Sequence, residues 1–238
     1  MPGQSSAELQ RHPYEPWIPD SARALILGSA PPWRFCQPEP KPLRQLDVDY
    51  YYGSYDRGCN LFWETMFRVF DPSQVESLER LRRLDSPRDA RTLGQRAFLQ
   101  EWLAHRQLGI ADILLRFERR GQSASDGKLT AREFTDLDGI LDEHPDLEAI
   151  YCTSRGVFHW LRQYLAAFLP SAVPSDLQSF TWPKPGSADP YSRTLSICVL
   201  PSPSPIGRIR FPSHQDFVDH LVRTYRKQFS ALFKQLQA

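Results

Sequence analysis

The chain has few cysteines, no long hydrophobic run and almost no net charge, and each of these absences narrows its possible functions. Its four cysteines lie apart, with no Cys-x-x-Cys pair, so the sequence predicts neither a zinc site nor a disulfide framework. No apolar run reaches the roughly 20 residues that a membrane helix requires. Residues 1–10 also lack the basic and then apolar pattern of a secretory signal. We therefore expect a soluble, cytoplasmic monomer that uses no metal and no other cofactor.

The formal net charge of +1 does not by itself indicate a protein that binds nucleic acid. The charge is unevenly distributed, however, because six Lys or Arg and only two Asp lie from Leu200 to the end of the chain. Such a basic segment suits contact with phosphates, although basic residues near a helix C-terminus are also ordinary. A nucleotide hydrolase of the P-loop type is disfavoured, because the chain has no Gly-Lys-Ser/Thr loop.

Short apolar runs alternate with longer amphipathic segments, which predicts an α/β fold with a parallel sheet covered on both faces. We expect a three-layer sandwich with a four-stranded parallel sheet between helices. A chain of 238 residues suits one domain, here residues 21–238, preceded by a poorly ordered segment, residues 1–20. The predicted strands are residues 23–28, 108–115, 147–153 and 194–200. The predicted helices are residues 60–70, 72–84, 91–105, 130–142, 155–168 and 214–235, and residues 31–42, 119–127 and 174–193 are predicted to be loops or irregular.

Two of the predicted strands run directly into proline-rich turns, Gly28-Ser29-Ala30-Pro31-Pro32 and Pro201-Ser202-Pro203-Ser204-Pro205. In open α/β sheets, ligands bind beyond the carboxyl ends of the strands, where such turns lie. Between them in the sequence, residues 50–63 are rich in aromatic side chains and contain one carboxamide, Asn60. Aromatic faces and a carboxamide are suited to a flat heteroaromatic base.

Four segments carry motifs in a fixed order. They are Gly28-Ser29-Ala30-Pro31, Tyr51-Tyr52 with Asn60-Leu61-Phe62-Trp63, Gly109 and Asp112 with Arg119 and Gly121, and Leu200-Pro201-Ser202-Pro203-Ser204-Pro205. Together, over about residues 23–210, the chain resembles the uracil-DNA glycosylase superfamily, and most closely its mismatch-specific and hypoxanthine-DNA glycosylase branch. Three departures stand out. Pro32 replaces a family glycine, residues 53–59 are longer than the family's stretch and lack its His-Pro-Arg, and Leu200 stands where some members have a histidine.

The resemblance implies a uracil-DNA glycosylase-like fold and a monofunctional DNA glycosylase of base excision repair. Such an enzyme flips a deaminated base, uracil or hypoxanthine, out of DNA that contains a damaged or mismatched base and hydrolyses its N-glycosidic bond. Because negative charge develops on the leaving base, the reaction needs aimed donors and a positioned water. The implied site residues are Asn60 and Asp56 for catalysis, Gly28, Ser29, Ala30, Pro31, Tyr52 and Phe62 for the base pocket, and Ser202, Ser204, Arg208 and Arg210 for DNA binding.

Other interpretations of the same residues stay open. Asn60 suits the N-cap of the helix that follows it, Asp56 suits an exposed loop, and Tyr52 and Phe62 suit a hydrophobic core. The longer stretch before Asn60 suits a relative that binds nucleic acid without catalysis, and the same pocket suits an enzyme of small nucleosides or nucleotides.

Overall fold

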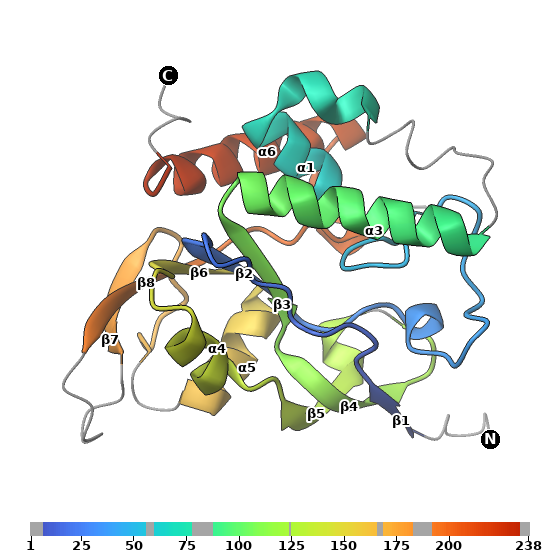
Figure 1. Ribbon diagram of the computed structural model, residues 1–238, viewed down its shortest axis with the longest axis horizontal. Coiled ribbons are helices and arrows are strands. Elements are labelled where there is room, and N and C mark those ends of the chain that lie inside the picture. Colours follow the sequence, from blue (N-terminus) through green and yellow to red (C-terminus); the bar gives the residue numbers. More distant parts are fainter. Residues whose placement is uncertain are drawn as a thin grey trace.

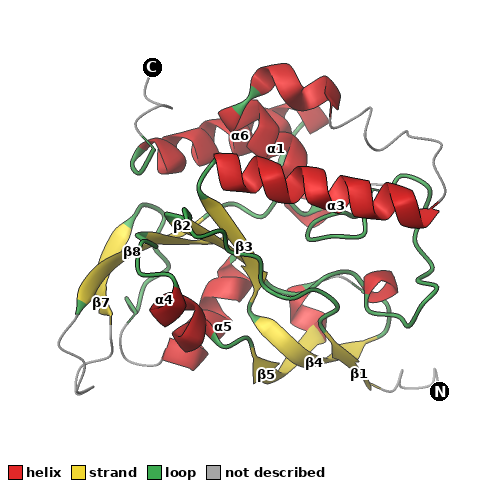
Figure 2. Cartoon of the chain, in the orientation of Figure 1, coloured by secondary structure: helices red, strands yellow, loops and turns green. Residues whose placement is uncertain are grey.

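A five-stranded sheet forms the centre of the molecule, with helices on both of its faces (Figures 1 and 2). The computed structural model describes residues 7–55, 60–77, 88–123, 125–165, 169–182 and 192–233, without the side chains of residues 88–93. The strands of this sheet, in spatial order, are β3 (Leu108–Asp112), β2 (Ala24–Gly28), β6 (Ala149–Cys152), β8 (Arg193–Val199) and β7 (Gln178–Trp182). The first four are parallel to one another, and β7 is antiparallel to β8.

Strands β2, β3 and β6 are buried along their whole length, which explains why they read as continuous apolar runs in the sequence. Gly28 pairs with Asp112, and Leu27 pairs with Cys152. The carboxyl ends of these three strands therefore lie at one edge of the sheet, which is where an open α/β sheet offers a ligand site.

Each face of the sheet packs on its own group of helices. Helices α1 (Phe62–Phe70), α3 (Arg88–His105) and α6 (His214–Ser230) cover one face, and α4 (Leu137–Glu143) and α5 (Arg155–Leu165) cover the other (Figure 1). Alternate residues of β2 supply the two cores: Ala24 and Ile26 face the first group, and Leu25 and Leu27 face the second. Both layers are needed to bury such a strand.

A second sheet of three antiparallel strands lies beside the first, in the order β1-β4-β5. Its strands are β1 (Ala7–Arg11), β4 (Leu114–Arg120) and β5 (Leu129–Phe134). Ile113 separates β3 from β4, so the chain leaves the parallel sheet and enters the antiparallel one within two residues. A turn at Gly121, whose φ is 67°, follows β4.

The structure corrects several predictions of the sequence analysis. The α/β class is confirmed and the four predicted parallel strands are present, but they belong to a mixed sheet of five strands and not to a four-stranded one. Residues 114–120 and 129–134 form strands where the sequence predicted a strand end with a loop and the start of a helix. Their alternating burial, with exposed charged side chains, is the pattern of a half-buried antiparallel strand.

The N-terminal segment also differs from its prediction, because β1 pairs with β4 and both His12 and Tyr14 are buried. Residues 178–182, predicted to be irregular, form the edge strand β7. Four short 3-10 helices complete the described elements: η1 (Trp33–Phe35), η2 (Pro72–Gln74), η3 (Asp126–Lys128) and η5 (Pro205–Arg210). None of the helices in the described ranges combines the length and the apolar character needed to cross a membrane. The prediction of a single domain stays a prediction.

Candidate active site

The turn after β2 brings two polar side chains against the backbone of Gly28. A Cβ atom at position 28 would lie 2.0 Å from Asp112 Oδ1 and 2.3 Å from the Tyr52 hydroxyl. Only glycine leaves space for this approach. The Gly28 carbonyl accepts a hydrogen bond from Ile113 N at 2.8 Å, which fixes the turn beside the end of β3. The predicted pocket residue Gly28 is therefore next to a carboxylate and a phenol.

Tyr52 adopts a left-handed backbone conformation, with a φ of 53°, which a residue other than glycine rarely adopts. Its ring stacks on Phe62, with centroids 4.1 Å apart and planes at 25°, and its hydroxyl hydrogen-bonds to Thr153 Oγ1 at 2.9 Å. Such strain persists only where surrounding contacts hold it, and it is most frequent at functional sites. Tyr52 is partly exposed whereas Phe62 is fully buried, so Phe62 supports the ring of Tyr52 from the core.

Asn60 is partly exposed and lies two residues before the start of α1. Its Oδ1 accepts a hydrogen bond from Phe62 N at 2.9 Å, although Leu61 occupies the N-cap position. The side chain thus partly fills the capping role weighed in the sequence analysis. Within the described part of the chain, no protein acceptor receives a hydrogen bond from its Nδ2 group. The other predicted catalytic residue, Asp56, lies outside the described residues.

The loop after β8 lies directly beside Asn60, because Leu61 N donates a hydrogen bond to the Pro203 carbonyl at 2.9 Å. Ser202 Oγ accepts from Ser204 N, and Ser204 Oγ accepts from Ile206 N, so each hydroxyl keeps its own proton to donate. Helix α6 supports this loop through the Tyr225 hydroxyl, which donates to the Pro201 carbonyl at 3.0 Å.

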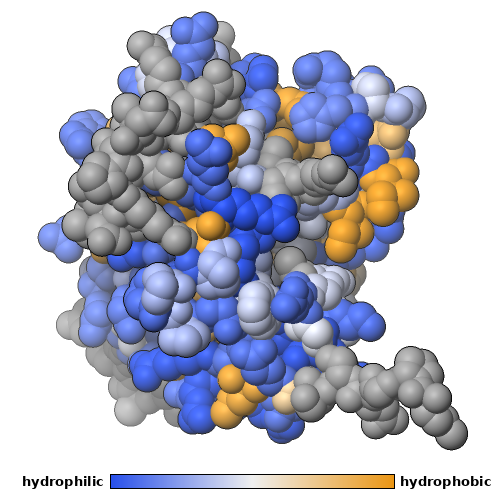
Figure 3. Space-filling view, turned by 90° about the vertical axis from the view of Figure 1, so that its right-hand side faces the viewer, coloured by the Kyte–Doolittle hydropathy of each residue, from blue (hydrophilic) through white to orange (hydrophobic). Residues whose placement is uncertain are grey.

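Helix η5 continues this loop and is mostly exposed. It carries the predicted DNA-binding residues Arg208 and Arg210, both exposed, together with Ile206 and Ile209, which are 58% and 83% exposed. Most surface of the face in Figure 3 is hydrophilic, and hydrophobic residues form only small separate patches on it. Within the described residues, Ile206 and Ile209 are the two most exposed of the large hydrophobic side chains.

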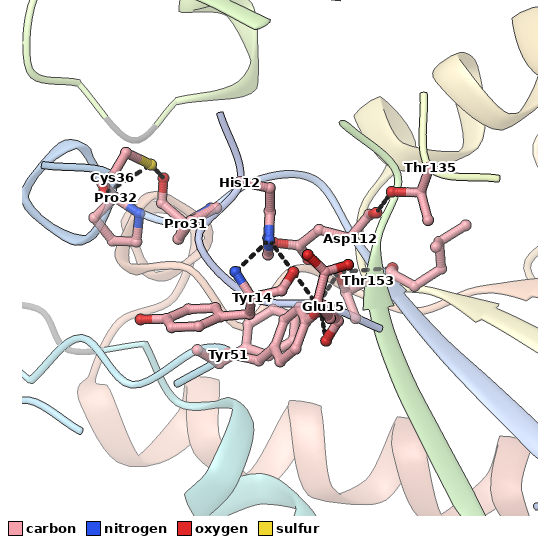
Figure 4. A network of polar contacts seen from close by, with 12 residues as sticks. His12, Tyr14, Glu15, Pro31, Pro32, Cys36, Tyr51, Asp112, Thr135 and Thr153 are labelled. Atoms are coloured by element: carbon pink, nitrogen blue, oxygen red, sulfur yellow. Dashed lines mark hydrogen bonds and ion pairs between the residues drawn. The ribbon is translucent and has the colours of Figure 1, made fainter. Parts of the chain in front are cut away.

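His12 and Asp112 form a buried pair that the sequence analysis did not assign to the site. His12 Nε2 lies 2.8 Å from Asp112 Oδ2, and each residue is only 6% exposed (Figure 4). The other ring nitrogen, Nδ1, lies 2.8 Å from the Tyr14 carbonyl, so both nitrogens of His12 have polar partners. The His12 ring stacks on Tyr51, with centroids 5.3 Å apart. Asp112 belonged to a matched motif, but no local pattern links it to His12, 100 residues away.

Asp126, the first residue of η3, is a second carboxylate beside the turn. Its Oδ2 accepts a hydrogen bond from Ser154 Oγ at 2.9 Å, and the Ser29 side chain lies near enough to help lower its pKa. A Cβ atom on Gly156 would lie 2.4 Å from the same Oδ2. Burial raises the pKa of Asp126, and the charge of Asp112 raises it further, against the opposing effect of the two serines.

Arg119 holds the turn after β2 in place by a hydrogen bond to its backbone. Its side chain is fully buried on β4, where it donates to the Pro31 carbonyl at 2.5 Å, to Ser123 O and to Gln10 Oε1. Burial lowers the pKa of Arg119. The sequence analysis predicted a loop from residue 119 onward, and this is wrong for Arg119, which lies on β4. Pro31 is buried and Ala30 half-buried, so they hold the turn in place while Gly28 and Ser29 meet the polar groups.

Comparison with known proteins finds no family model and no curated protein that matches the chain. Among solved structures, the chain is similar to a solution NMR structure from Methanosarcina acetivorans described as a "putative Uracil DNA glycosylase". The similarity has 18% sequence identity and a TM-score of 0.48, and it covers 92% of this chain and 99% of the other. In the ranges that the structure describes, no three His, Cys, Asp or Glu side chains gather as metal ligands would.

Proposed function

We propose that this protein is a monofunctional DNA glycosylase, which hydrolyses the N-glycosidic bond of a deaminated base, uracil or hypoxanthine, after that base has left the stack. The hydrogen bond from Leu61 N to the Pro203 carbonyl carries the proposal. It joins the segment with the aromatic residues and the carboxamide to the loop with the serines and arginines. A group that holds a base and a group that holds its phosphates must be neighbours in any enzyme of this kind.

The aromatic and amide groups suit a flat leaving base. The Tyr52 ring, which stacks on Phe62, is the aromatic group against which we expect the base to stack. Asn60 Nδ2 is available to donate a hydrogen bond to a carbonyl oxygen of the base or to hold the attacking water. Donors that are aimed at a developing negative charge lower the barrier of such a reaction.

The neighbouring loop and η5 suit the DNA around that base. Ser202 and Ser204 have protons to donate to phosphate oxygens, and Arg208 and Arg210 supply positive charge. The exposed Ile206 and Ile209 resemble the apolar side chains that other DNA-binding proteins insert between base steps. These contacts would hold DNA with a damaged or mismatched base, and they need neither a metal nor an organic cofactor.

The test is a screen of the purified protein against duplex and single-stranded oligonucleotides that each contain one damaged base, with abasic product as the readout. We expect base release from at least one uracil or hypoxanthine substrate. A protein that binds these duplexes without releasing a base would be a non-catalytic relative. A protein that releases bases from free nucleosides and has little affinity for DNA would be a small-molecule enzyme. Either of these last two outcomes contradicts the proposal.

Replacing Asn60 tests its role in the reaction. Asn60→Ala should lose on the order of 10²-fold in single-turnover base excision, the usual scale for one transition-state donor, with a much smaller change in DNA affinity. Asn60→Asp keeps the hydrogen bond to Phe62 N but brings a charge into the site, so it should fold normally and also lose activity. Unfolding temperature, DNA affinity and excision rate are measured for both variants. A normal rate in folded Asn60→Ala would remove Asn60 from the mechanism and direct attention to Asp56.

A further inference from the structure

Two carboxylates, those of Asp112 and Asp126, lie near the turn that follows β2. Asp112 Oδ1 occupies the space that a side chain on Gly28 would need. Asp126 accepts a hydrogen bond from Ser154, whose neighbour Thr153 hydrogen-bonds to the Tyr52 hydroxyl and to the Leu27 carbonyl. The charges of both carboxylates also act on the hydroxyl of Tyr52. The two groups come from different elements, because Asp112 is the last residue of β3 and Asp126 is the first residue of η3.

The hydrogen-bond partners of the two carboxylates differ in kind. Asp112 Oδ2 is occupied by His12 Nε2, so its position is fixed. Its Oδ1 accepts no hydrogen bond from the residues that the structure describes, and it faces the Gly28 turn. Within the described residues, the hydrogen bond of Asp126 comes from the Ser154 hydroxyl, and a hydroxyl can donate to a carboxylate or accept from a carboxylic acid. The surroundings of Asp112 thus favour a fixed hydrogen-bond acceptor, and those of Asp126 accommodate a protonated acid.

We propose that Asp112 and Asp126 are the base and the acid of the hydrolysis, and that His12 is a positioning residue for Asp112. The inference rests on the proposed function and goes beyond it, because neither carboxylate was among the predicted catalytic residues. Paired carboxyl groups in different environments are a recurring solution to glycosidic bond cleavage.

The reaction balances with these two groups alone. The water oxygen forms a bond to the sugar C1′ as the bond between C1′ and the base nitrogen breaks. Asp112 Oδ1 takes a proton from the water, and Asp126 gives its proton to the leaving base. The base then departs neutral, and both carboxyl groups return to their starting states by proton exchange with solvent.

The pH dependence follows from the groups around Asp126. Asp112 on β3 and burial raise the pKa of Asp126, whereas Arg119 on β4, Ser29 and Ser154 lower it, and the net direction is upward. The acid form of Asp126 is present below this pKa, so activity falls as the pH rises through it. The alkaline side of the pH profile therefore reports the protonation of Asp126.

The experiment is the pH profile of single-turnover excision by the full chain, for wild type and four variants. Asp126→Asn should lose 10²-fold to 10⁴-fold in rate and lose the alkaline limb, as expected when a general acid is removed. Asp112→Asn removes the proposed base and should also lose about 10²-fold to 10⁴-fold in rate. Ser154→Ala keeps the carboxyl of Asp126 but removes a hydrogen bond that lowers its pKa, so the alkaline limb should move to higher pH. Asp20→Asn, at an exposed aspartate, is the matched control and should follow wild type.

The outcomes separate this inference from the function on which it rests. If wild type releases no base from any duplex, both fail. If wild type is active and folded Asp126→Asn keeps its rate and its alkaline limb, the acid–base pair alone is overturned. If Asp126→Asn does not fold, Ser154→Ala decides, and an alkaline limb at the wild-type position overturns the pair.

Discussion

Gly28 is the residue on which the site depends most directly, because the Asp112 carboxylate and the Tyr52 hydroxyl occupy the space that a side chain there would need. Glycine is needed at position 28 because two oxygens approach it closely, and not because of its backbone conformation. The left-handed conformation near this site belongs to Tyr52. A glycine of this kind differs from one that only lies on a surface. Gly94 on α3 illustrates the contrast, because an added Cβ there would meet nothing within 4 Å.

The two glycines give a matched prediction. Gly28→Ala should destabilise the protein by about 1–3 kcal/mol, the cost of forcing atoms into a packed site, and should abolish excision by displacing both oxygens. Gly94→Ala should instead stabilise the protein by about 0.5–1 kcal/mol, because alanine favours an exposed helix position, and activity should not change. Denaturant unfolding and excision rates check both variants. Equal stability of the two would show that the contacts at Gly28 are not close.

At the scale of the elements, η5 and the antiparallel sheet provide a second contrast. Arg208 and Arg210 are exposed on η5, at the end of the loop beside Asn60. Arg116 and Arg132 are exposed on β4 and β5, where each pairs with a glutamate. Only the first two extend the proposed DNA surface.

DNA affinity should therefore depend on one pair of arginines and not on the other. The double variant Arg208→Ala, Arg210→Ala should bind a damaged duplex more weakly, and the slope of affinity against salt should become shallower by about two counterions, one for each lost phosphate contact. The Arg116→Ala, Arg132→Ala control should bind as wild type does. Binding isotherms at three salt concentrations measure this. Wild-type affinity of the first variant at every salt concentration would exclude η5 from the DNA surface.

The strands that could be predicted from the sequence are those that are buried on both faces. β2, β3, β6 and β8 were predicted because a strand buried on both faces is a continuous apolar run. β4 and β5 were missed because each has one exposed face, whose arginines and glutamates read as loop or helix. The turn at Gly28 and the aromatic Tyr52 were predicted from local patterns. The pairing of His12 with Asp112 was not, since contacts across 100 residues leave no local signal.

At the scale of the whole molecule, the site gathers residues from both sheets. Gly28, Asp112 and Thr153 come from the ends of the parallel strands or just after them. Arg119 comes from the antiparallel sheet, and His12 follows β1, the strand that pairs only with β4. The parallel sheet is buried between helices, whereas β1 is an edge strand with four of its five residues exposed.

Heat inactivation should therefore precede global melting. An exposed edge strand opens at a lower free energy than a buried central strand, and opening of β1 withdraws His12 from Asp112 while the central sheet stays folded. In native-state hydrogen exchange, the amides of β1 should exchange through such partial opening, and those of β2 only through global unfolding. Excision should decline at temperatures where circular dichroism still reports a native sheet. Equal opening energies for β1 and β2, with activity lost only at the melting transition, would mean that this protein unfolds as a single cooperative unit.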